Sequence, residues 1–329
     1  MRKILSISIA AYNVEKFLDK TLRSLVVDKN IMDLIEVIII DDGSVDKTNN
    51  IAKSYCERYP DTFILVKKEN GGYGSTINSA IRIAKGEYFK LLDGDDWFET
   101  KNIAGFIGYL SICNSDLVIT PYIKCYKSNR KIEVVDTHTN LSSEIQVITD
   151  NLFLDDILMH EITVKTSILL MNNIAITEKC FYTDNEYALD VLINSKTVSK
   201  FNSEIYCYRL GEQGQSVSIQ GMIKHFDDAV IMANMILNRY DDLDFEKKYI
   251  RKKINIIFTL LYESYLIKEN EVQSKQELRR FEQRLKNEFP KVYDATNEVK
   301  KIEVLRRTHY ILWKLIKKYV VQKIKDNGK

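Results

Sequence analysis

Apolar runs and amphipathic segments alternate along the first hundred residues. The runs predict buried strands, and the apolar residues spaced three and four positions apart between them predict helices. The predicted strands and helices follow one another in the order 4–10, 14–26, 35–40, 47–59, 63–67, 75–84 and 87–92. This alternation is typical of a mainly parallel, twisted sheet, and we therefore predict an α/β fold.

The rest of the chain follows two other patterns. Its middle part mixes a strand-like stretch, 162–170, with a helical one, 184–194. From about residue 221 apolar residues recur at helical spacing, and few breaks are expected because the whole chain holds only 3 prolines and 12 glycines. We therefore expect an α/β domain over 1–220 and an all-helical region over 221–329.

Composition and charge exclude several classes of protein. Apolar residues make up 45% of the chain, which excludes intrinsic disorder. The 48 lysines and arginines against 46 acids leave a net charge of +2, too balanced for binding nucleic acid over the whole surface. Five cysteines without a C-x-x-C pair argue against a disulfide framework or a zinc knuckle and indicate the cytoplasm. No stretch reaches the roughly 18 apolar residues of a spanning helix, so we expect only peripheral contact with the inner face of the cell membrane.

Carboxylates crowd together at the end of the last predicted strand. Asp93, Asp95 and Asp96 lie within four positions, and such close like charges are destabilising unless a cation lies among them. The side chains of Asp93 and Asp95 lie on one side of an extended backbone, and Mg²⁺ and Mn²⁺ prefer such oxygen ligands. The residues that follow do not fit a calcium-binding EF-hand loop. The alternative is an acidic helix N-terminus, for which one carboxylate would suffice.

Two further segments have residues that suit a nucleotide. Asp41 and Asp42 follow the strand 35–40, and acids at this edge of a parallel sheet commonly bind the base or sugar of a nucleoside. Capping of the next helix would account for only one of them. A glycine-rich turn in 69–80 leads into a helix whose first amides could face phosphate, although it fits neither G-x-G-x-x-G nor the P-loop.

These three segments, in this order and spacing, resemble the family-two glycosyltransferases, which have the GT-A fold. The matching stretches are SISIAAYNVEKFLDKTLRSL from residue 6, EVIIIDDGSVDKT from residue 36 and NGGYGSTINSAIRIAKGEYFKLLDGDDWF from residue 70. The resemblance is dense over 4–100 and thinner up to 218. It implies transfer of a sugar from a nucleotide sugar, as in the synthesis of bacterial surface polysaccharides.

The resemblance implies a role for each matching residue. Tyr12 would pack on the base of the nucleotide, and Asp42 would contact the base. Asp93 would bind the ribose, and Asp95 would hold the Mn²⁺ or Mg²⁺ ion that bridges the diphosphate. The residues expected to bind the nucleotide are Ala10, Tyr12, Asp41, Asp42, Asn78, Asp93 and Gly94.

The catalytic base is expected in 182–192, where acids directly precede an apolar helix. Asp184 matches the second acid of the family's acidic pair, and Thr183 occupies the position of the first. Glu186 stays an alternative base, and helix capping stays an alternative role for Asp184.

A second set of residues is expected near the diphosphate or the acceptor. The segment 208–218 lacks the Arg-Trp pair of processive synthases, which favours transfer of one sugar per encounter. The four histidines show no metal-ligand spacing, and His160 is kept as a candidate for the acceptor pocket. The residues expected to contact diphosphate or acceptor are Asp96, Arg209, Gln215 and Ser216.

The last segment, from Arg306, is basic and amphipathic. Before the terminal lysine it holds seven lysines and arginines and one acid. Trp313, Ile316, Val320 and Ile324 form one helical stripe, which together with these charges predicts a helix lying at the surface of an anionic membrane. The alternative is a terminal helix that packs on the preceding helices.

We therefore expect an inverting, metal-dependent hexosyl- or N-acetylhexosaminyltransferase that uses a UDP-sugar. A single base opposite the leaving group implies one displacement and hence inversion. The acceptor would be a glycan or a lipid-linked molecule, and no nucleic acid is expected as a partner. A sugar nucleotidyltransferase would need a glycine-rich loop after the first strand, which AAYNVEKF does not provide. A degenerate nucleotide-sugar-binding or scaffold protein stays an alternative because of Thr183. The sugar, the linkage and the formation of a homodimer stay open.

Overall fold

The computed structural model describes residues 2–127, 130–149, 152, 156–211 and 218–327. The chain folds into two compact units, Met1–Leu210 and Gly211–Lys329. The division comes ten residues before the boundary expected near 220, because the last strand of the first unit ends at Leu210 and helical structure begins at Ile219.

Unit 1 is built on a sheet that has eight strands among the described residues. Four neighbouring strands are parallel, and the strand next to them joins β4 in antiparallel orientation. The order across the sheet is β3 (Phe63–Lys67), β2 (Ile35–Asp41), β1 (Leu5–Ala11), β4 (Tyr88–Asp93), β10 (Ile162–Lys165), β6 (Leu117–Ile119), β11 (Thr197–Lys200) and β9 (Gln146–Val147). The predicted α/β fold with a mainly parallel sheet is therefore confirmed.

The register of the central strands brings three polar strand ends to one edge of the sheet. Ala10 lies opposite both Ile40 on β2 and Asp93 on β4. Ala11 lies opposite Asp41. Residues that directly follow these strands therefore gather at the same edge, as expected for parallel strands.

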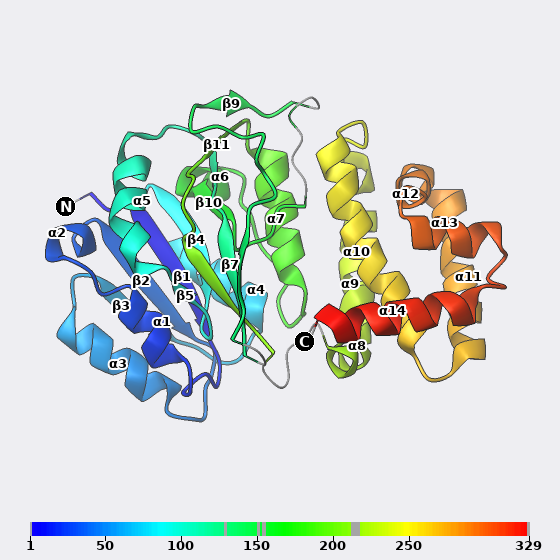
Figure 1. Cartoon of the computed structure of the whole chain (residues 1–329), viewed down its shortest axis with the longest axis horizontal. Helices are drawn as coiled ribbons and strands as arrows, with labels where there is room; N and C mark the ends of the chain where they lie inside the picture. The colour runs from blue at the N-terminus through cyan, green and yellow to red at the C-terminus, as the bar shows by residue number, and fades with distance from the viewer. Residues whose placement is uncertain (1, 128–129, 150–151, 153–155, 212–217, 328–329) are drawn as a thin grey trace. The chain divides into compact units, whose positions relative to one another are not determined.

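Helices cover both faces of this sheet (Figure 1). Helix α4 packs on β1 and β2 and contacts α7, whereas α1 and α3 contact each other. The helices of unit 1 are α1 (Leu18–Ser24), α2 (Lys29–Met32), α3 (Thr48–Arg58), α4 (Tyr73–Ile83), α5 (Thr100–Ile112), α6 (Thr166–Met171) and α7 (Thr183–Asn194). Strand β2 is buried along its whole length, which explains why its sequence is almost entirely apolar.

A smaller sheet lies next to the polar edge. Its order is β5 (Trp97–Phe98), β12 (Tyr206–Leu210), β7 (Tyr122–Tyr126) and β8 (Ile132–Val135). Cys207 on β12 lies opposite Trp97, directly after the acidic turn 93–96. This pairing brings the end of unit 1 beside the carboxylates predicted to bind a metal.

Unit 2 consists of helices, as predicted for this part of the chain. The long helix α10 contacts α8, α9, α11, α12 and α14. The elements are α8 (Ile219–Lys224), α9 (Phe226–Asn238), the short 3₁₀ helix η1 (Tyr240–Asp242), α10 (Lys248–Ile267), α11 (Glu271–Glu288), α12 (Pro290–Thr296), α13 (Lys300–Arg307) and α14 (Trp313–Asn327). The predicted apolar stripe of α10 is buried at Ile254, Ile257, Phe258 and Leu261.

The apolar stripe predicted to lie on a membrane faces the inside of unit 2 instead. Trp313 and Val320 are 0% exposed and Ile316 is 8% exposed. The prediction for these residues is wrong, because an apolar stripe is buried equally well against neighbouring helices, which α14 finds in α10 and α13. Ile324 is half-buried. No helix within the described part of the chain is long and apolar enough to cross a membrane.

Arg306, counted among the basic residues of that segment, also has an internal role. Its guanidinium forms an ion pair with Glu282 at 2.8 Å and donates to the carbonyl oxygen of Tyr293 and to the hydroxyl group of Tyr262. Burial raises the pKa of Glu282, while the charge of Arg306 opposes this effect. Arg306 therefore connects helices within unit 2 and is not exposed for membrane binding.

Candidate active site

The turn between β4 and β5 carries the three crowded carboxylates. The backbone N–H of Gly94 donates to the carbonyl oxygen of Ala10 at 3.1 Å. A Cβ atom at position 94 would lie only 2.7 Å from this oxygen, so the close approach of the two strands requires glycine. The hydroxyl group of Thr21 donates to the carbonyl oxygens of Gly94 (3.0 Å) and Asp96 (2.6 Å). The turn is thus held by β1 and α1.

Each carboxylate of the turn makes ionisation of its neighbours less favourable. Burial, followed by the charge of Asp95, raises the pKa of Asp93 to about 7. Burial and the charges of Asp95 and Asp93 also raise the pKa of Asp96. The hydroxyl group of Tyr73 donates to Asp93 at 2.7 Å, and that of Tyr206 donates to Asp96 at 2.6 Å. These hydrogen bonds offset only part of the free-energy cost of burying neighbouring negative charges, and a bound cation would offset more of this cost.

Three side chains converge in a way that fits a metal ion. Ligand atoms of Asp93, Asp96 and His160 lie within 4.8 Å of one another. Two carboxylate oxygens and one imidazole nitrogen suit a divalent ion such as Mn²⁺. Asp95, the expected ligand, does not belong to this cluster and acts on it through its charge. Its assignment as the metal ligand stays a prediction.

His160 is the residue of this cluster that the sequence did not indicate as a ligand. It lies close to three tyrosines, with ring centroids 5.3 Å from Tyr122, 4.6 Å from Tyr206 and 4.3 Å from Tyr208. The three tyrosines belong to the smaller sheet, whereas His160 comes just before β10, which pairs with β4 in the large sheet. No sequence spacing links His160 to Asp93, since tertiary contacts bring them together.

Asp41 and Asp42 are buried and have partners within the protein. Asp41 accepts hydrogen bonds from the backbone of Ser44 (2.9 Å) and the side chain of Asn49 (2.8 Å). Asp42 forms an ion pair with Lys68 at 2.6 Å. Each carboxylate oxygen can accept two hydrogen bonds, so these partners do not prevent a further contact. A contact of Asp41 or Asp42 with a base stays a prediction.

The glycine-rich turn binds the carboxylate of Asp42. The backbone N–H groups of Gly71 and Gly72 donate to Asp42 at 3.0 and 2.8 Å. Gly72 has a φ of +81°, a conformation that favours glycine. These two amides are therefore directed at the protein's own carboxylate, and the idea that the turn offers them to phosphate is not supported by their contacts.

Tyr12 lies at the end of β1 and is accessible. Its side chain is 52% exposed. The neighbouring Asn13 links two loops: its backbone N–H donates to Ser44, and its side chain accepts from the backbone N–H of Val45. The structure thus presents an aromatic ring beside the ends of β1 and β2, and packing of Tyr12 on a base stays a prediction.

Asn78, expected to bind the nucleotide, forms hydrogen bonds to the segment before α7. Its side chain donates to the carbonyl oxygen of Ile176 (2.8 Å) and to Glu178 (3.1 Å), and it accepts from the backbone N–H of Ile176 (2.8 Å). Asn78 therefore positions the chain that leads to Asp184. None of its contacts points to a nucleotide.

The two candidate bases on α7 have different surroundings. Glu186 accepts hydrogen bonds from the backbone N–H and the hydroxyl group of Thr177, at 2.8 and 3.0 Å, and is buried. Asp184 is half-buried. Its charge contributes to the raised pKa values of Asp93 and Tyr73. The fold therefore brings Asp184 within electrostatic reach of the acidic turn, while Glu186 holds the loop at Thr177.

Arg209 is bound to the acidic turn. Its backbone N–H donates to Asp96 at 2.7 Å, and its side-chain Nε donates to the carbonyl oxygen of Asp95 at 2.7 Å. The guanidinium group lies 4.8 Å from the ring centre of Phe17 and 5.0 Å from that of Trp97. Arg209 thus adds positive charge next to the carboxylates. The other two residues of the 208–218 segment expected at the diphosphate, Gln215 and Ser216, lie outside the described residues.

Comparisons with known proteins place this site in a family. A family model described as "Glycosyl transferase family 2" matches residues 6–179. The chain is 36% identical over 145 residues to the uncharacterized glycosyltransferase MG060 of Mycoplasma genitalium, which covers 43% of this chain and 48% of that protein. The matched region thus spans about half the length of this relative.

Solved structures share the fold. Staphylococcus aureus TarS 1–349 in complex with UDP-GlcNAc superposes with a TM-score of 0.54 at 17% identity, covering 93% of this chain and 92% of that one. The mannosyltransferase PcManGT of Pyrobaculum calidifontis, in complex with GDP-Man and Mn²⁺, superposes with a TM-score of 0.56 at 16% identity, covering 99% and 87%. The GT-A fold is thereby confirmed. The family model matches more than half of the residues of this chain. The chain therefore belongs to glycosyl transferase family 2.

Proposed function

We propose that the protein transfers a hexose or N-acetylhexosamine from a UDP-sugar to a hydroxyl group, with inversion at the anomeric carbon. The observation that carries this proposal is the cluster of Asp93, Asp96 and His160 at the sheet edge, where Asp184 is close enough to contribute to the raised pKa of Asp93. Membership of the family and the UDP-GlcNAc bound to the similar TarS structure support a nucleotide-sugar donor.

The donor would bind across the ends of β1, β2 and β4. Tyr12 offers an exposed ring for the base, beside Asp41 and Asp42. Asp93 would bind the ribose. Mn²⁺ or Mg²⁺ held by Asp95 and its neighbours would act as a Lewis acid and neutralise charge on the departing diphosphate. The cluster of Asp93, Asp96 and His160 and the Mn²⁺ in the similar mannosyltransferase support this assignment.

Asp184 would take the proton from the attacking hydroxyl group. A positioned base of this kind contributes about 10² to 10⁴ to the rate. Glu186 does not suit the role, because its oxygens accept hydrogen bonds from Thr177. With Asp184 as the base on the side opposite the leaving group, the sugar would be displaced in a single step. Such a step inverts the configuration of the anomeric carbon.

The two parts of the chain would have different roles. We assign sugar transfer to the domain predicted over 1–220 and contact with the membrane surface to the helical region after it. The acceptor would be a glycan or a lipid-linked molecule reached from the cytoplasmic side, as in the synthesis of surface polysaccharides. A homodimer is compatible with this arrangement but not required by it.

The experiment that tests the proposed reaction measures release of nucleoside diphosphate. The purified chain would be incubated with UDP-, GDP- and TDP-sugars, with Mn²⁺ or with EDTA, and with a soluble glycan acceptor. We expect UDP release that depends on Mn²⁺ and is lost in Asp184→Asn. Donor binding without turnover under every condition would instead indicate a degenerate binding protein, in keeping with the threonine at position 183.

A further inference from the structure

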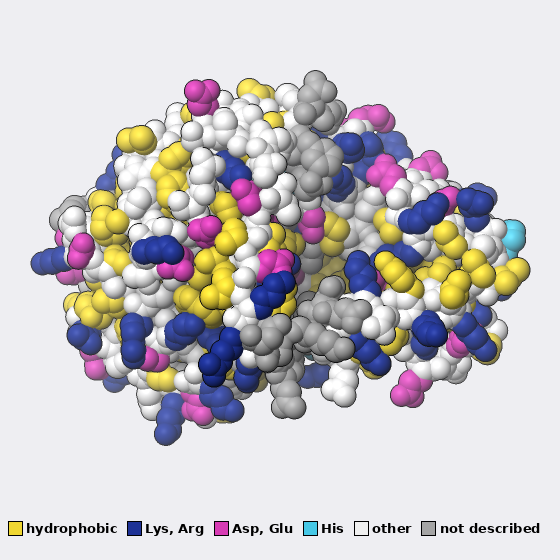
Figure 2. All heavy atoms as spheres, viewed as in Figure 1, with side chains coloured by type: hydrophobic (Ala, Val, Ile, Leu, Met, Phe, Trp, Pro, Cys, Tyr) yellow, Lys and Arg dark blue, Asp and Glu magenta, His cyan; other side chains and the backbone are white. Residues whose placement is uncertain are grey.

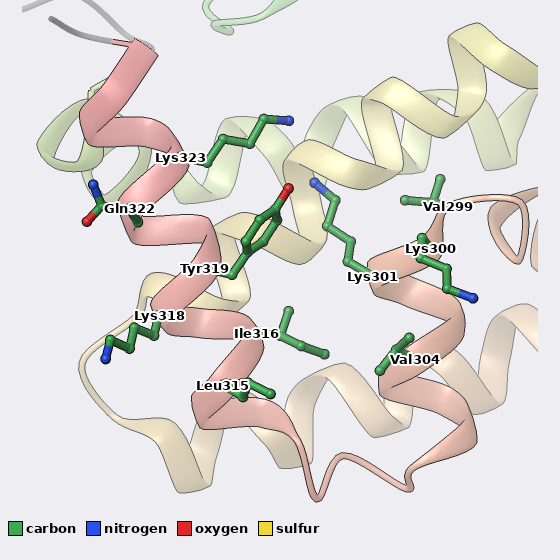
Figure 3. Close-up of a pocket in the computed structure, with 10 residues that line it drawn as sticks. All are labelled: Val299, Lys300, Lys301, Val304, Leu315, Ile316, Lys318, Tyr319, Gln322 and Lys323. Carbon is green, nitrogen blue, oxygen red and sulfur yellow. The ribbon is translucent and has the colours of Figure 1, made fainter.

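Unit 2 has a hollow between α13 and α14 that the proposed reaction does not use. Its volume is about 780 Å³. Figure 3 shows Ile316 and Tyr319 on α14 across the hollow from Val304 and Lys301 on α13. Most of the surface that lines it is apolar, with Leu315 completing the wall. An apolar hollow that is open to solvent is a feature of binding sites.

A second apolar stripe on α14 extends from this hollow. Ile311 lies in the turn before α14, and Leu315 and Tyr319 lie four residues apart on one face of this helix. They are 80%, 64% and 62% exposed. This stripe is distinct from the buried stripe that begins at Trp313. Large apolar side chains exposed together in this way usually meet an apolar partner.

Positive charge surrounds the stripe and the hollow. The ten residues that line the hollow include four lysines and no acid. Residues 300–329 hold ten lysines and arginines and two acids, a net charge of +8, so the first 299 residues carry −6 of the protein's total of +2. Figure 2 shows exposed apolar side chains over α13 and α14 next to lysines and arginines. The segment that forms the two walls of the hollow is thus far more basic than the rest of the chain.

Two of the four lysines keep their charge available for a ligand. Lys300 and Lys301 form ion pairs with Glu303 and Glu263. Lys318 and Lys323 are exposed, and neither forms an ion pair with any described side chain. They lie on α14 on either side of Tyr319 in sequence, so that free cationic groups flank the apolar wall.

We propose that the hollow between α13 and α14 is the site at which unit 2 binds an anionic membrane lipid. An acyl chain would contact Val304, Leu315, Ile316 and Tyr319, and Lys318 and Lys323 would bind phosphate groups at the membrane surface. A soluble polyanion would satisfy the lysines but would leave the apolar wall in water, which is why we favour a lipid. The proposal needs neither donor nor metal and so goes beyond the reaction of unit 1.

The test is binding of the full chain to vesicles, measured by flotation. We expect binding to vesicles that contain phosphatidylglycerol and little binding to pure phosphatidylcholine. The variant Lys318→Gln, Lys323→Gln should bind about thirtyfold more weakly, since a lysine near such a surface contributes about 1 kcal/mol and 1.4 kcal/mol is a factor of ten. Leu315→Ser with Tyr319→Ser should weaken binding about tenfold. These four side chains are exposed, so the fold should persist, which circular dichroism checks.

Matched controls come from the same unit. Lys286→Gln with Lys291→Gln removes two exposed lysines elsewhere, and Val272→Ser removes an exposed apolar side chain on α11; both variants should bind like the original protein. Equal binding by the lysine variant and its control would overturn the proposal. So would serine variants of the apolar wall that bind vesicles normally, because the site would then be a polyanion surface, a result that heparin binding would show directly.

The result does not depend on catalysis. Asp184→Asn should bind vesicles as well as the original protein even if it transfers no sugar. Conversely, a protein that binds vesicles as described but never releases UDP would contradict the proposed reaction and leave the lipid site standing.

Discussion

Burial and the charge of Asp95 raise the pKa of Asp93, at the end of β4, and the carboxylate of Asp184, at the start of α7, adds to this effect. Asp93 and Asp184 are far apart in sequence, and the hydrogen bonds of Asn78 to Ile176 hold the segment that leads to α7. A carboxylate that would act on the acceptor is thereby electrostatically coupled to one that would bind the donor.

Replacing Asp184 should separate catalysis from donor binding. Asp184→Asn keeps the shape of the side chain but cannot take a proton, so we expect transfer to fall by roughly 10² or more. The affinity for UDP in the presence of Mn²⁺, measured by calorimetry, should change little. The control is Glu186→Gln, which weakens the hydrogen bonds to Thr177 and should lower the melting temperature. If Glu186→Gln instead abolishes transfer in a folded protein, the base is Glu186.

The raised pKa of Asp93 predicts how stability depends on pH without metal. The side chain titrates at about 7 when folded, against about 3.9 when unfolded. Between these values the folded state holds a proton that the unfolded chain has released, so the free energy of unfolding should fall as the pH rises from 4 to 7. Urea denaturation in EDTA at pH 5 and pH 8 measures this change. Asp93→Asn should show a smaller change, and an identical change in both proteins would contradict the prediction.

Removal of the charge at Asp95 should weaken the metal-dependent part of donor binding. With Asp95→Asn the cluster around Asp93 and Asp96 loses one negative charge, and a divalent ion gains less by binding there. We expect Mn²⁺ to increase the thermal stabilisation by UDP in the original protein but not in this variant. Asp61→Asn, a change at an exposed position, serves as the control. Full activity of the original protein in EDTA would rule out a metal requirement.

Two glycine-to-alanine changes should have opposite effects. Gly94→Ala places a Cβ atom 2.7 Å from the carbonyl oxygen of Ala10, and such overpacking costs about 1 to 3 kcal/mol. Gly108→Ala lies on α5, where the new Cβ would meet no described atom within 4 Å beyond the adjoining backbone of its own helix, and alanine stabilises a helix by about 1 kcal/mol relative to glycine. Urea denaturation of both variants checks the signs. A neutral Gly94→Ala would mean that the acidic turn can shift away from β1.

Loss of Arg306 should destabilise unit 2. Arg306→Leu leaves Glu282 buried without its cation, a change that costs about 3 to 5 kcal/mol in comparable cases. Arg307→Leu, at a neighbouring position that is 73% exposed, should change the free energy of unfolding by less than about 1 kcal/mol. Adding Glu282→Leu to Arg306→Leu should recover part of the loss, because no buried charge then remains. Equal stability of the two single variants would contradict the assigned role of Arg306.

Much of the fold could be predicted from local sequence pattern. Apolar runs predicted β1 to β4 correctly, and the helical spacing of Ile254 to Leu261 predicted α10. The acidic turn, the strand end at Asp41 and Asp42 and the family itself were also evident, because each depends on residues that are neighbours in the chain. Parallel pairing then brings these strand ends to one edge without further information.

Other features depended on contacts between distant segments. His160 reaches Asp93 because it comes just before β10, which pairs with β4 in antiparallel orientation. Glu186 differs from Asp184 because it accepts hydrogen bonds from Thr177. The apolar stripe that begins at Trp313 could be seen in the sequence. The helices that bury it, α10 and α13, could not be predicted, because periodicity shows that a helix face is apolar but not which element packs on that face. The sequence by itself therefore determined which residues are apolar, charged and locally structured. The tertiary structure decided which of them meet, since the burial and electrostatic energies that select those contacts arise only when distant segments pack together.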